Sequence, residues 1–306
     1  MKKTIIPVIA WMLALVGAPA FAQQTTGNIQ GRIVDAQKAA VPGVTVTAKS
    51  TDTGFVRSEV TDSEGVYRLN ALPVGKYDLH AEVSGFAPYE RKGVEVTIGQ
   101  TLDVNVDLNL AGMKEEVQVT AELPLVSTTN SSVGGVVDPG RIENLPLNGR
   151  QFANLAATIP GVGLGFHTDP TKSSQYSPQI NGGNGRNLNY QIDGGDNNDD
   201  TVGGLLQLFP LEAIEEFNFQ TSRYKAEYGR SVGGVMNVVT KSGTNDLRGS
   251  FFELFRDKAL NAETHSEQNT LDLNGHAVGK QKYRGNQFGG SFGGPIIKNQ
   301  IHYFAA

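Results

Sequence analysis

The most polar stretch of the sequence is residues 187–200, NLNYQIDGGDNNDD, in which four Asp and four Asn residues lie close together. Their carboxylate and amide oxygens are the ligands that a hard cation such as Ca²⁺ prefers. An EF-hand loop places such ligands at positions 1, 3 and 5, Gly at position 6 and Glu at position 12. Counted from Asp196, position 6 is Thr201 and position 12 is Gln207. The tight turn and the bidentate ligand are therefore both missing.

A count from Asp193 fails sooner, because it puts Gly195 at position 3. We therefore interpret the stretch as a strand that ends in a turn at Gly194 and Gly195, followed by a hydrated polar loop and not by a metal site. If this loop faces a ligand, the residues expected to do so are Tyr190, Asp193, Asp196 and Asn197.

No other residues form a recognisable catalytic constellation. The chain has no cysteine, which excludes disulfides, thiolate catalysis and Cys-ligated metals. The zinc-protease, nucleophile-elbow and Walker A motifs are absent from the sequence. Glu215 and Glu216 are neighbours on a predicted helix, so we expect them to point in different directions into solvent. We also expect His80 to lie in solvent and not to be a ligand. The sequence predicts no enzyme and no cofactor.

Charge and the N-terminus restrict the partners and the compartment. The net charge is −5 and Lys and Arg form no block, which argues against nucleic acid. Residues 1–22 combine a basic start, an apolar run and an Ala20-Phe21-Ala22 cleavage signature, as in a secretory signal peptide. The alternative is a membrane-spanning helix, but Pro7 and Pro19 interrupt the run. Because no later segment is apolar enough to span as a helix, a membrane role requires strands.

Residues 23–110 alternate apolar and polar side chains in short runs separated by turn residues. This pattern predicts about seven antiparallel strands in a β-sandwich. The side chains expected on the buried faces are Ile29, Ile33, Val44, Val46, Ala48, Tyr77, Leu79, Ala81, Val83, Val94, Val96, Ile98, Leu102, Val104, Val106 and Leu108. The block TDSEGVYRLNALPVGKY resembles the carboxypeptidase regulatory-like domain. The resemblance implies a transthyretin-like accessory module, of a kind sometimes grouped with carbohydrate-binding sandwiches, and no peptidase.

Residues 111–131 contain one short alternating run, EEVQVTAE, which is too short to form a sheet alone. It could be a linker with a residual edge strand, or a strand that adds to the sheet of another protein. The residues concerned are Glu115, Glu116, Val117, Val119, Thr120 and Ala121.

Residues 132–245 mix predicted helices and strands and indicate an α+β domain. Asp138 and Pro139 predict the start of a short helix. The clearest helix follows Asn148, which could cap it together with Gln151, and buries residues at i, i+3, i+4 and i+7. Residues 210–217 are expected to form another helix. Strands are expected in SVGGVV, RNLNYQID and VGGVMNVVT, where paired glycines allow close backbone approach.

Residues 246–306 are rich in Phe and Gly and resemble, weakly, the strands of membrane barrels. Roughly residues 112–306 are similar to the TonB-dependent outer-membrane receptors, in particular Oar-like members. The blocks that carry the resemblance are PLNGRQFANLAATIPGV, QINGGNGRNLNYQIDGGDNND, PLEAIEEFNFQTSRYKAEYGRSVGGVMNVVTKSGTNDLRGSFFELFRD and NQFGGSFGGPIIKN. The resemblance implies that residues 132–245 are a plug domain and that EEVQVTAE is a TonB box, which favours strand addition.

A complete barrel of about 22 strands needs roughly 220 residues in strands alone, whereas residues 246–306 provide about three strands. We therefore expect a multidomain chain: an all-β transthyretin-like sandwich, an α+β plug, and the first strands of a truncated transmembrane β-barrel. The resemblance implies ligand uptake in the outer membrane with a periplasmic N-terminal domain. Its partners would be the periplasmic domain of TonB, outer-membrane lipid and an extracellular ligand, with carbohydrate as one candidate. The alternative function is a secreted or surface adhesin that binds carbohydrate or protein.

Overall fold

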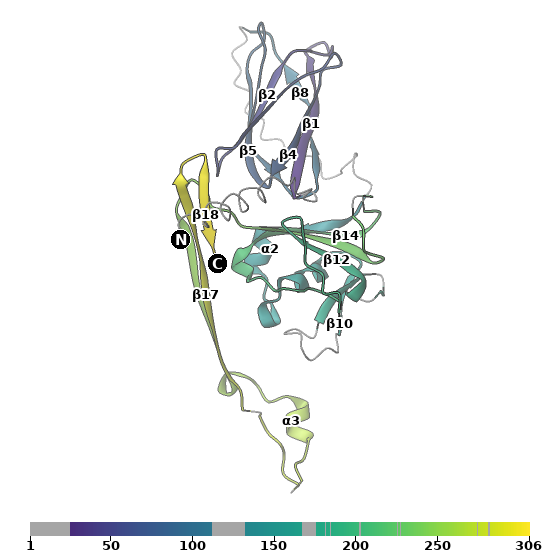
Figure 1. Ribbon diagram of the computed structural model, residues 1–306, viewed down its shortest axis with the longest axis vertical. Helices are drawn as coiled ribbons and strands as arrows, with labels where there is room; N and C mark the ends of the chain where they lie inside the picture. Colours follow the sequence, from purple (N-terminus) through teal and green to yellow (C-terminus); the bar gives the residue numbers. More distant parts are fainter. Residues whose placement is uncertain are drawn as a thin grey trace, which may run out of the picture.

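The structure is a computed structural model that describes residues 25–111, 132–166, 176–180, 182–183, 185–201, 203–224, 226, 228–273, 275–280 and 282–306. It has three parts: an N-terminal sandwich, a middle domain and a long β-sheet arm at the C-terminal end (Figure 1). The predicted signal peptide (1–22) and the predicted TonB box (115–122) lie outside the described residues.

The sandwich consists of two four-stranded sheets. One sheet contains β1 (Thr26–Asp35), β4 (Val66–Pro73), β7 (Thr101–Asp103) and β8 (Val106–Leu108). The other has the order β3-β2-β5-β6 and contains β2 (Thr45–Ser50), β3 (Val56–Val60), β5 (Gly75–Glu82) and β6 (Tyr89–Val96). Nearly all of the alternating apolar residues expected inside are buried between the two sheets. The predicted sandwich and its buried faces are therefore confirmed.

The expectation that all of these strands are antiparallel was wrong for two pairings. β1 pairs in parallel with β7, Ile29 lying opposite Leu102, and in parallel with β8, Ile33 lying opposite Val106. After β6 the chain crosses from the second sheet back to the first and runs beside β1 in the same direction. Alternation reports which side chains are buried, and it does not report which strand is the neighbour.

The middle domain is built on a five-stranded mixed sheet of order β13-β12-β15-β14-β9. Its strands are β9 (Val133–Val137), β12 (Leu188–Ile192), β13 (Gly195–Asp196), β14 (Ile214–Ser222) and β15 (Gly234–Thr240). The strands predicted in SVGGVV, RNLNYQID and VGGVMNVVT are thus confirmed. A hairpin of β10 (Val162–Phe166) and β11 (Tyr176–Ile180) lies beside the sheet, and short helices pack against one face.

Gly234 shows why this sheet needs glycine. A Cβ atom built at this residue would lie 2.2 Å from Ile180 Cδ1 and 2.5 Å from the carbonyl oxygen of Gln220. Any larger residue would therefore push β15 away from its neighbours, as the paired glycines of the sequence suggested.

Helix α2 (Pro139–Asn144) begins as predicted, because the Asp138 side chain accepts a hydrogen bond from the Arg141 backbone N–H at 2.9 Å. The predicted long helix after Asn148 was wrong in type and start. The segment forms two 3₁₀ helices, η1 (Asn148–Arg150) and η2 (Phe152–Thr158), and Gln151 is the N-cap of the second without a side-chain hydrogen bond. Gly149 and Arg150 both have positive φ, which breaks the helix between the two parts.

The helix predicted over residues 210–217 was also wrong. Only η4 (Leu211–Ala213) is helical, and Ile214 already begins β14. β14 lies between β15 and β9, so both of its edges are hydrogen-bonded, and most of its side chains on both faces are buried. Tertiary pairing therefore overrides the apolar spacing of three and four residues that suggested a helix.

The C-terminal sheet consists of β16 (Arg248–Asp257), β17 (Arg284–Ile297) and β18 (Ile301–Ala305). The connection between β16 and β17 contains η5 (Lys258–Leu260) and α3 (His265–Asn269) and extends away from the rest of the molecule (Figure 1). The predicted strands of this region are confirmed. No helix in the described part of the chain is both long enough and apolar enough to cross a bilayer.

Candidate functional site

The polar run of residues 187–200 contains β12, and the part after this strand is a turn and a loop at one edge of the middle domain's sheet. Asp193 and Gly194 both have positive φ and connect β12 to β13. The Asp193 carboxylate accepts hydrogen bonds from the backbone N–H of Thr240, at 2.9 Å, and from its hydroxyl, at 2.6 Å. A turn is therefore confirmed, but it lies one residue earlier than predicted, at Asp193 and Gly194, and Gly195 already begins β13. Asp193 also ties the turn to the end of β15.

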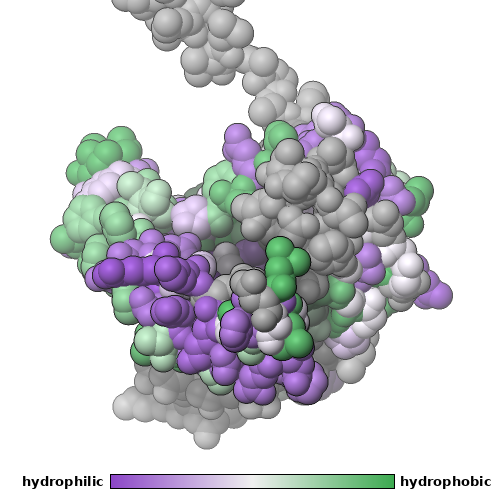
Figure 2. Space-filling view, turned by 90° about the horizontal axis from the view of Figure 1, so that it is seen from below, coloured by the Kyte–Doolittle hydropathy of each residue, from purple (hydrophilic) through white to green (hydrophobic). Residues whose placement is uncertain are grey.

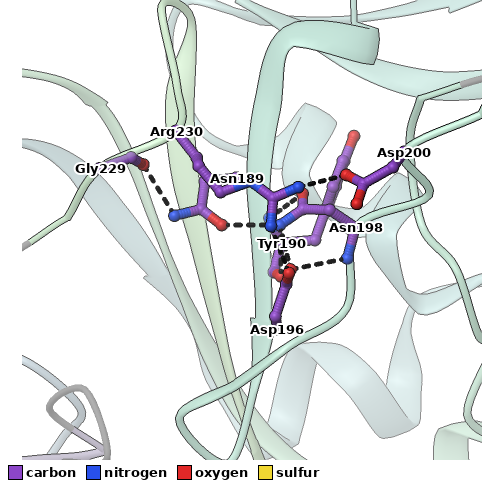
Figure 3. A network of polar contacts seen from close by, with 7 residues as sticks. All are labelled: Asn189, Tyr190, Asp196, Asn198, Asp200, Gly229 and Arg230. Carbon is purple, nitrogen blue, oxygen red and sulfur yellow. Dashed lines mark hydrogen bonds and ion pairs between the residues drawn. The ribbon is translucent and has the colours of Figure 1, made fainter.

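Asp196 lies at the surface in a network with Arg230 and two neighbouring residues (Figure 3). Arg230 forms ion pairs with Asp196 and Asp200, and Asn198 donates to Asp196. Partial burial raises the pKa of Asp196, but the hydrogen bonds from Asn198 and the charge of Arg230 outweigh this, so the pKa lies below its ordinary value. Asp196 is therefore an ionised and already paired carboxylate at neutral pH.

Asn198 joins this surface network to the sheet. Its side-chain oxygen accepts from the Tyr190 backbone N–H at 2.9 Å, and its amide nitrogen donates to Asn189 Oδ1 at 2.9 Å. Asn189 in turn donates to the carbonyl oxygen of Gly229 at 2.9 Å (Figure 3). The network therefore fixes the loop after β13 to β12 and to the segment that precedes β15.

The four residues predicted to face a ligand occupy two different environments. Asp193 and Asp196 are exposed. Tyr190 is only 1% exposed and its hydroxyl donates to the carbonyl oxygen of Gly185 at 3.1 Å. Asn197 is 5% exposed and makes two hydrogen bonds with the backbone of Gln207, at 3.0 and 3.1 Å. Two of the residues are thus placed to meet solvent, and two are placed to hold the loop.

The chemistry of this loop is that of a structural ion-pair network. Among the residues that the structure describes, no group of three or more His, Asp or Glu side chains is arranged to hold a metal ion. Of the two carboxylates predicted to face a ligand, Asp196 is paired with Arg230 and Asp193 is bound to Thr240.

A second polar site, which the sequence-based expectations missed, lies on β14 under the sandwich. Glu216 is 2% exposed and accepts a hydrogen bond from the Ile98 backbone N–H at 2.5 Å. Asn218 donates to the carbonyl oxygen of the same Ile98 at 3.1 Å. The expectation that Glu216 lies in solvent was wrong, because residues 214–222 form a central strand and not a surface helix. The alternation of polar and aromatic residues in EEFNFQ was the signal that could have revealed this.

Burial raises the pKa of Glu216 to about 7. The hydrogen bond from Ile98 opposes this effect, whereas the charges of Glu215, Glu95 and Asp138 add to it. Burial also raises the pKa of Glu215, which lines a cavity of about 600 Å³ between the three parts of the chain. The two adjacent carboxylates therefore face different surroundings.

His80 is exposed, as expected, and lies 3.4 Å from Glu82.

Arg150 connects the middle domain to the C-terminal sheet. Its guanidinium forms an ion pair with Glu212, and it lies 4.2 Å from the centroid of the Phe252 ring. Both charged side chains are largely shielded from solvent, which strengthens such cation–π contacts. This contact identifies the face of β16 that is directed toward the middle domain.

The opposite face of the C-terminal sheet is apolar and uncovered. Paired positions in the β16–β17 register place Phe251, Phe255, Phe288 and Phe292 on one face, interrupted by Glu253, and all four rings are exposed. In the view from below, hydrophobic residues gather along the left edge, the side on which this sheet lies in Figure 1 (Figure 2). Exposed apolar surfaces of this kind mark contacts with lipid or protein.

Comparison with known proteins identifies these parts. Residues 28–109 match the carboxypeptidase regulatory-like domain family, and residues 239–306 match an outer membrane β-barrel domain family. The whole chain aligns with the TonB-dependent transporter Oar of Myxococcus xanthus at 31% identity, and it spans 28% of the length of that protein.

Two solved structures show weaker likenesses. The siderophore receptor PirA from Acinetobacter baumannii is 21% identical, with 56% of this chain and 23% of that chain covered and a TM-score of 0.40. BcpA, the major pilin subunit of Bacillus cereus, is 20% identical, with 28% of this chain and 31% of that chain covered and a TM-score of 0.23. Likenesses of this size do not by themselves establish a shared fold. The full-chain relationship is to a transporter and not to an enzyme. The chain is part of a TonB-dependent outer-membrane receptor of the Oar-like kind, and it carries a carboxypeptidase regulatory-like domain.

Proposed function

We propose that this chain is the N-terminal portion of a receptor that takes up an extracellular ligand across the outer membrane by TonB-dependent, energy-coupled transport. The observation that carries the proposal is the alignment of the whole chain with a TonB-dependent transporter. The proposed domain organisation is the one expected from the sequence: a sandwich at 23–110, a TonB-box linker at 111–131, a plug at 132–245 and barrel strands from 246 onward.

The two faces of the C-terminal sheet support this arrangement. The Phe-bearing face is suited to the hydrocarbon of the outer membrane. The other face meets the middle domain through Phe252 and Arg150. A plug enclosed by a barrel requires this combination, with lipid outside and the plug inside. The proposal places the sandwich on the periplasmic side, as the sequence resemblance implies.

Residues 115–122 are the proposed site for the periplasmic domain of TonB. Glu115 and Glu116 precede alternating residues from Val117 onward, so the segment could add as a strand to an edge of its partner. The next described element along the chain is β9, the edge strand of the five-stranded sheet, which pairs only with β14 there. Tension applied to the segment would therefore reach the middle domain first at β9, where the sheet can be opened from its edge.

The ligand is proposed to meet the loop after β12, where Asp193 and Asp196 are exposed and Tyr190 and Asn197 hold the backbone. The network around Arg230 keeps this loop in one conformation, which favours recognition of a ligand without a large ordering cost. A carbohydrate is one candidate class of ligand, because domains like the sandwich are grouped with carbohydrate-binding modules.

A pull-down with the periplasmic domain of TonB tests the central step. We expect Val119→Pro to reduce retention of the chain at least tenfold, because proline removes a backbone N–H from the added strand. Ser127→Pro is the matched control, since it introduces the same residue into the same linker outside the segment, and it should be retained like the wild type. Equal retention of all three chains would contradict strand addition at this segment.

A further inference from the structure

The sandwich rests on a polar face of β14 (Figure 1). Phe217 and Phe219 point from this strand into the core of the middle domain, where both are fully buried. Glu216, Asn218 and Gln220 alternate with them and therefore lie on the opposite face. All three are less than a tenth exposed, although side chains of these types normally lie in solvent. This strand therefore presents a row of polar groups to whatever covers it.

The covering segment is the loop between β6 and β7 of the sandwich, and Glu216 and Asn218 hold both backbone polar groups of its residue Ile98. The sandwich uses the neighbouring groups itself: the Gly99 N–H donates to the carbonyl oxygen of Thr26 at 3.0 Å. Among the described residues, the Ile98 N–H and carbonyl oxygen bond to the middle domain and not to the sandwich. The two side chains thus bind both backbone polar groups of a single residue, as a hydrogen-bonded residue on a neighbouring antiparallel strand would.

The loop packs closely against β14, but two buried oxygen atoms in this contact have no hydrogen-bond partner. A Cβ atom at Gly99, whose φ is +69°, would lie 3.2 Å from the Asn218 amide nitrogen, so glycine allows the approach. Thr97 Oγ1 and Gln220 Oε1 are buried in this region without a hydrogen-bond partner. Unpartnered buried oxygens weaken an association, because each loses its water without replacement. The contact therefore has the properties of an interface that can open.

We propose that Glu216, Asn218 and the Ile98 peptide form a latch between the sandwich and the plug, and that ionisation of Glu216 releases it. The charged groups that act on Glu216 are Glu215 on the same strand, Glu95 on β6 and Asp138 at the start of α2, and all are acidic. A charge on Glu216 would therefore be repelled by all three of these groups and deprived of water, and the N–H of Ile98 only partly offsets this cost. The neutral acid is stable there, and its carbonyl oxygen can still accept the Ile98 N–H.

The direction of the pH dependence follows from the raised pKa of Glu216. In the docked form this pKa is about 7, whereas a carboxyl returned to water has a value near 4.5. The docked form thus binds more protons between these two values, so docking is strongest in acid and weakens as the pH rises. Because one proton is involved, the docking equilibrium changes by at most about tenfold per pH unit, and it levels off above the docked pKa.

The latch goes beyond the proposed transport function and requires neither TonB nor ligand. Asp52 of the sandwich also meets Arg248 of β16, at 3.1 Å. Both side chains of that pair are more than a third exposed, so salt at about 0.3 M should screen it. Two polar restraints then remain besides the covalent link through residues 112–131: the latch, and the hydrogen bond that the Asn245 N–H donates to the carbonyl oxygen of Asp52 at 2.8 Å.

Spin labels can follow the latch in the 306-residue chain itself, because it contains no cysteine. Val60 on the sandwich and Leu206 on the middle domain are both more than half exposed and suit replacement by labelled cysteine. Distances between the labels are measured in detergent at 0.3 M salt from pH 4.5 to 8.5. We expect a single short distance in acid, and a broad, longer population that grows until about pH 7 and then stays constant.

Three variants decide whether Glu216 is responsible. Glu216→Gln keeps the acceptor oxygen but cannot ionise, so it should stay docked up to pH 8.5. Glu215→Gln is the matched control: it keeps Glu216 ionisable and should still open as the pH rises, but it removes one repelling charge, so the opening should level off at a lower pH than in the wild type. Asn218→Asp turns the donor to Ile98 into an acceptor and should open under conditions where the wild type is closed.

A wild-type distance that does not change with pH would overturn the proposal, as would Glu216→Gln opening with the wild-type profile. If Glu216→Gln does not fold, as judged by circular dichroism, the wild-type pH series and Asn218→Asp still decide. An Asn218→Asp chain that stays docked like the wild type would then reject the latch.

Discussion

Asp193 and Asp196 hold the loop after β12 in different ways. Asp193 binds the backbone and hydroxyl of Thr240 and thereby closes the turn onto β15. Asp196 pairs with Arg230 across the surface, where water and salt weaken the attraction. At the scale of single residues, the geometry of the loop therefore depends more on the hydrogen bonds of Asp193 than on the ion pairs of Arg230.

Replacement of Asp193 tests this order of importance. Asp193→Ala removes both hydrogen bonds and places alanine at a positive φ, so we expect the free energy of unfolding to fall by about 1–2 kcal/mol. Asp193→Asn retains an acceptor and tolerates the backbone, and it should lose less than half of that amount. Urea unfolding at neutral pH measures both. An alanine variant as stable as the wild type would show that the turn does not need this anchor.

At the scale of elements, the middle domain and the C-terminal sheet are joined by few side chains. Arg150 is central among them, because its guanidinium contacts the Phe252 ring while paired with Glu212. Arg150 follows Gly149 in a left-handed turn, and that turn directs its backbone out of η1. The break between η1 and η2 therefore lies at the residue that contacts β16.

A double-mutant cycle with Arg150→Met and Phe252→Leu measures this contact. We expect the two substitutions to be coupled by about 0.5–2 kcal/mol in unfolding free energy, because either one alone removes the cation–π interaction. Phe251→Leu is the matched control, since Phe251 points to the opposite, exposed face. Coupling of Arg150 to Phe251 as large as its coupling to Phe252 would contradict the assigned orientation of β16.

At the scale of the whole molecule, the chain presents three surfaces suited to different environments. The sandwich has a mainly polar exterior and an apolar core, the middle domain has its own core, and the C-terminal sheet exposes aromatic rings. Exposed Phe side chains on a regular sheet are unfavourable in water. Their position is explained if this face of the receptor meets lipid.

Charged substitutions in the full-length receptor test this assignment. Phe288→Arg should reduce the amount of folded receptor in the outer membrane, since arginine on the lipid face near the bilayer centre costs about 2–4 kcal/mol. Gln287→Arg, the next residue on the opposite face, should assemble normally. Heat-modifiable migration of the receptor in isolated outer membranes measures folding. An equal loss of folded receptor for both variants would contradict the assignment of the Phe-bearing face to lipid.

The strands of the sandwich and their buried residues followed from the sequence, because alternation depends on local geometry that each short run carries within itself. The turn expected at Gly194 and Gly195 was located to within one residue for the same reason, since Asp193 and Gly194 are of types that tolerate positive φ. The receptor family could be recognised because its motifs recur in one order along the chain.

The helix predicted over 210–217 failed because its apolar spacing fits a strand covered on both faces equally well, and only the neighbours β9 and β15 distinguish the two. The alternation in EEFNFQ signalled that Glu216 lies on a strand, but its partner could not be predicted, because Ile98 is distant along the chain and belongs to another domain. Short runs of residues determine local secondary structure. The protonation state of a buried carboxyl, in contrast, depends on the groups that the tertiary structure places around it.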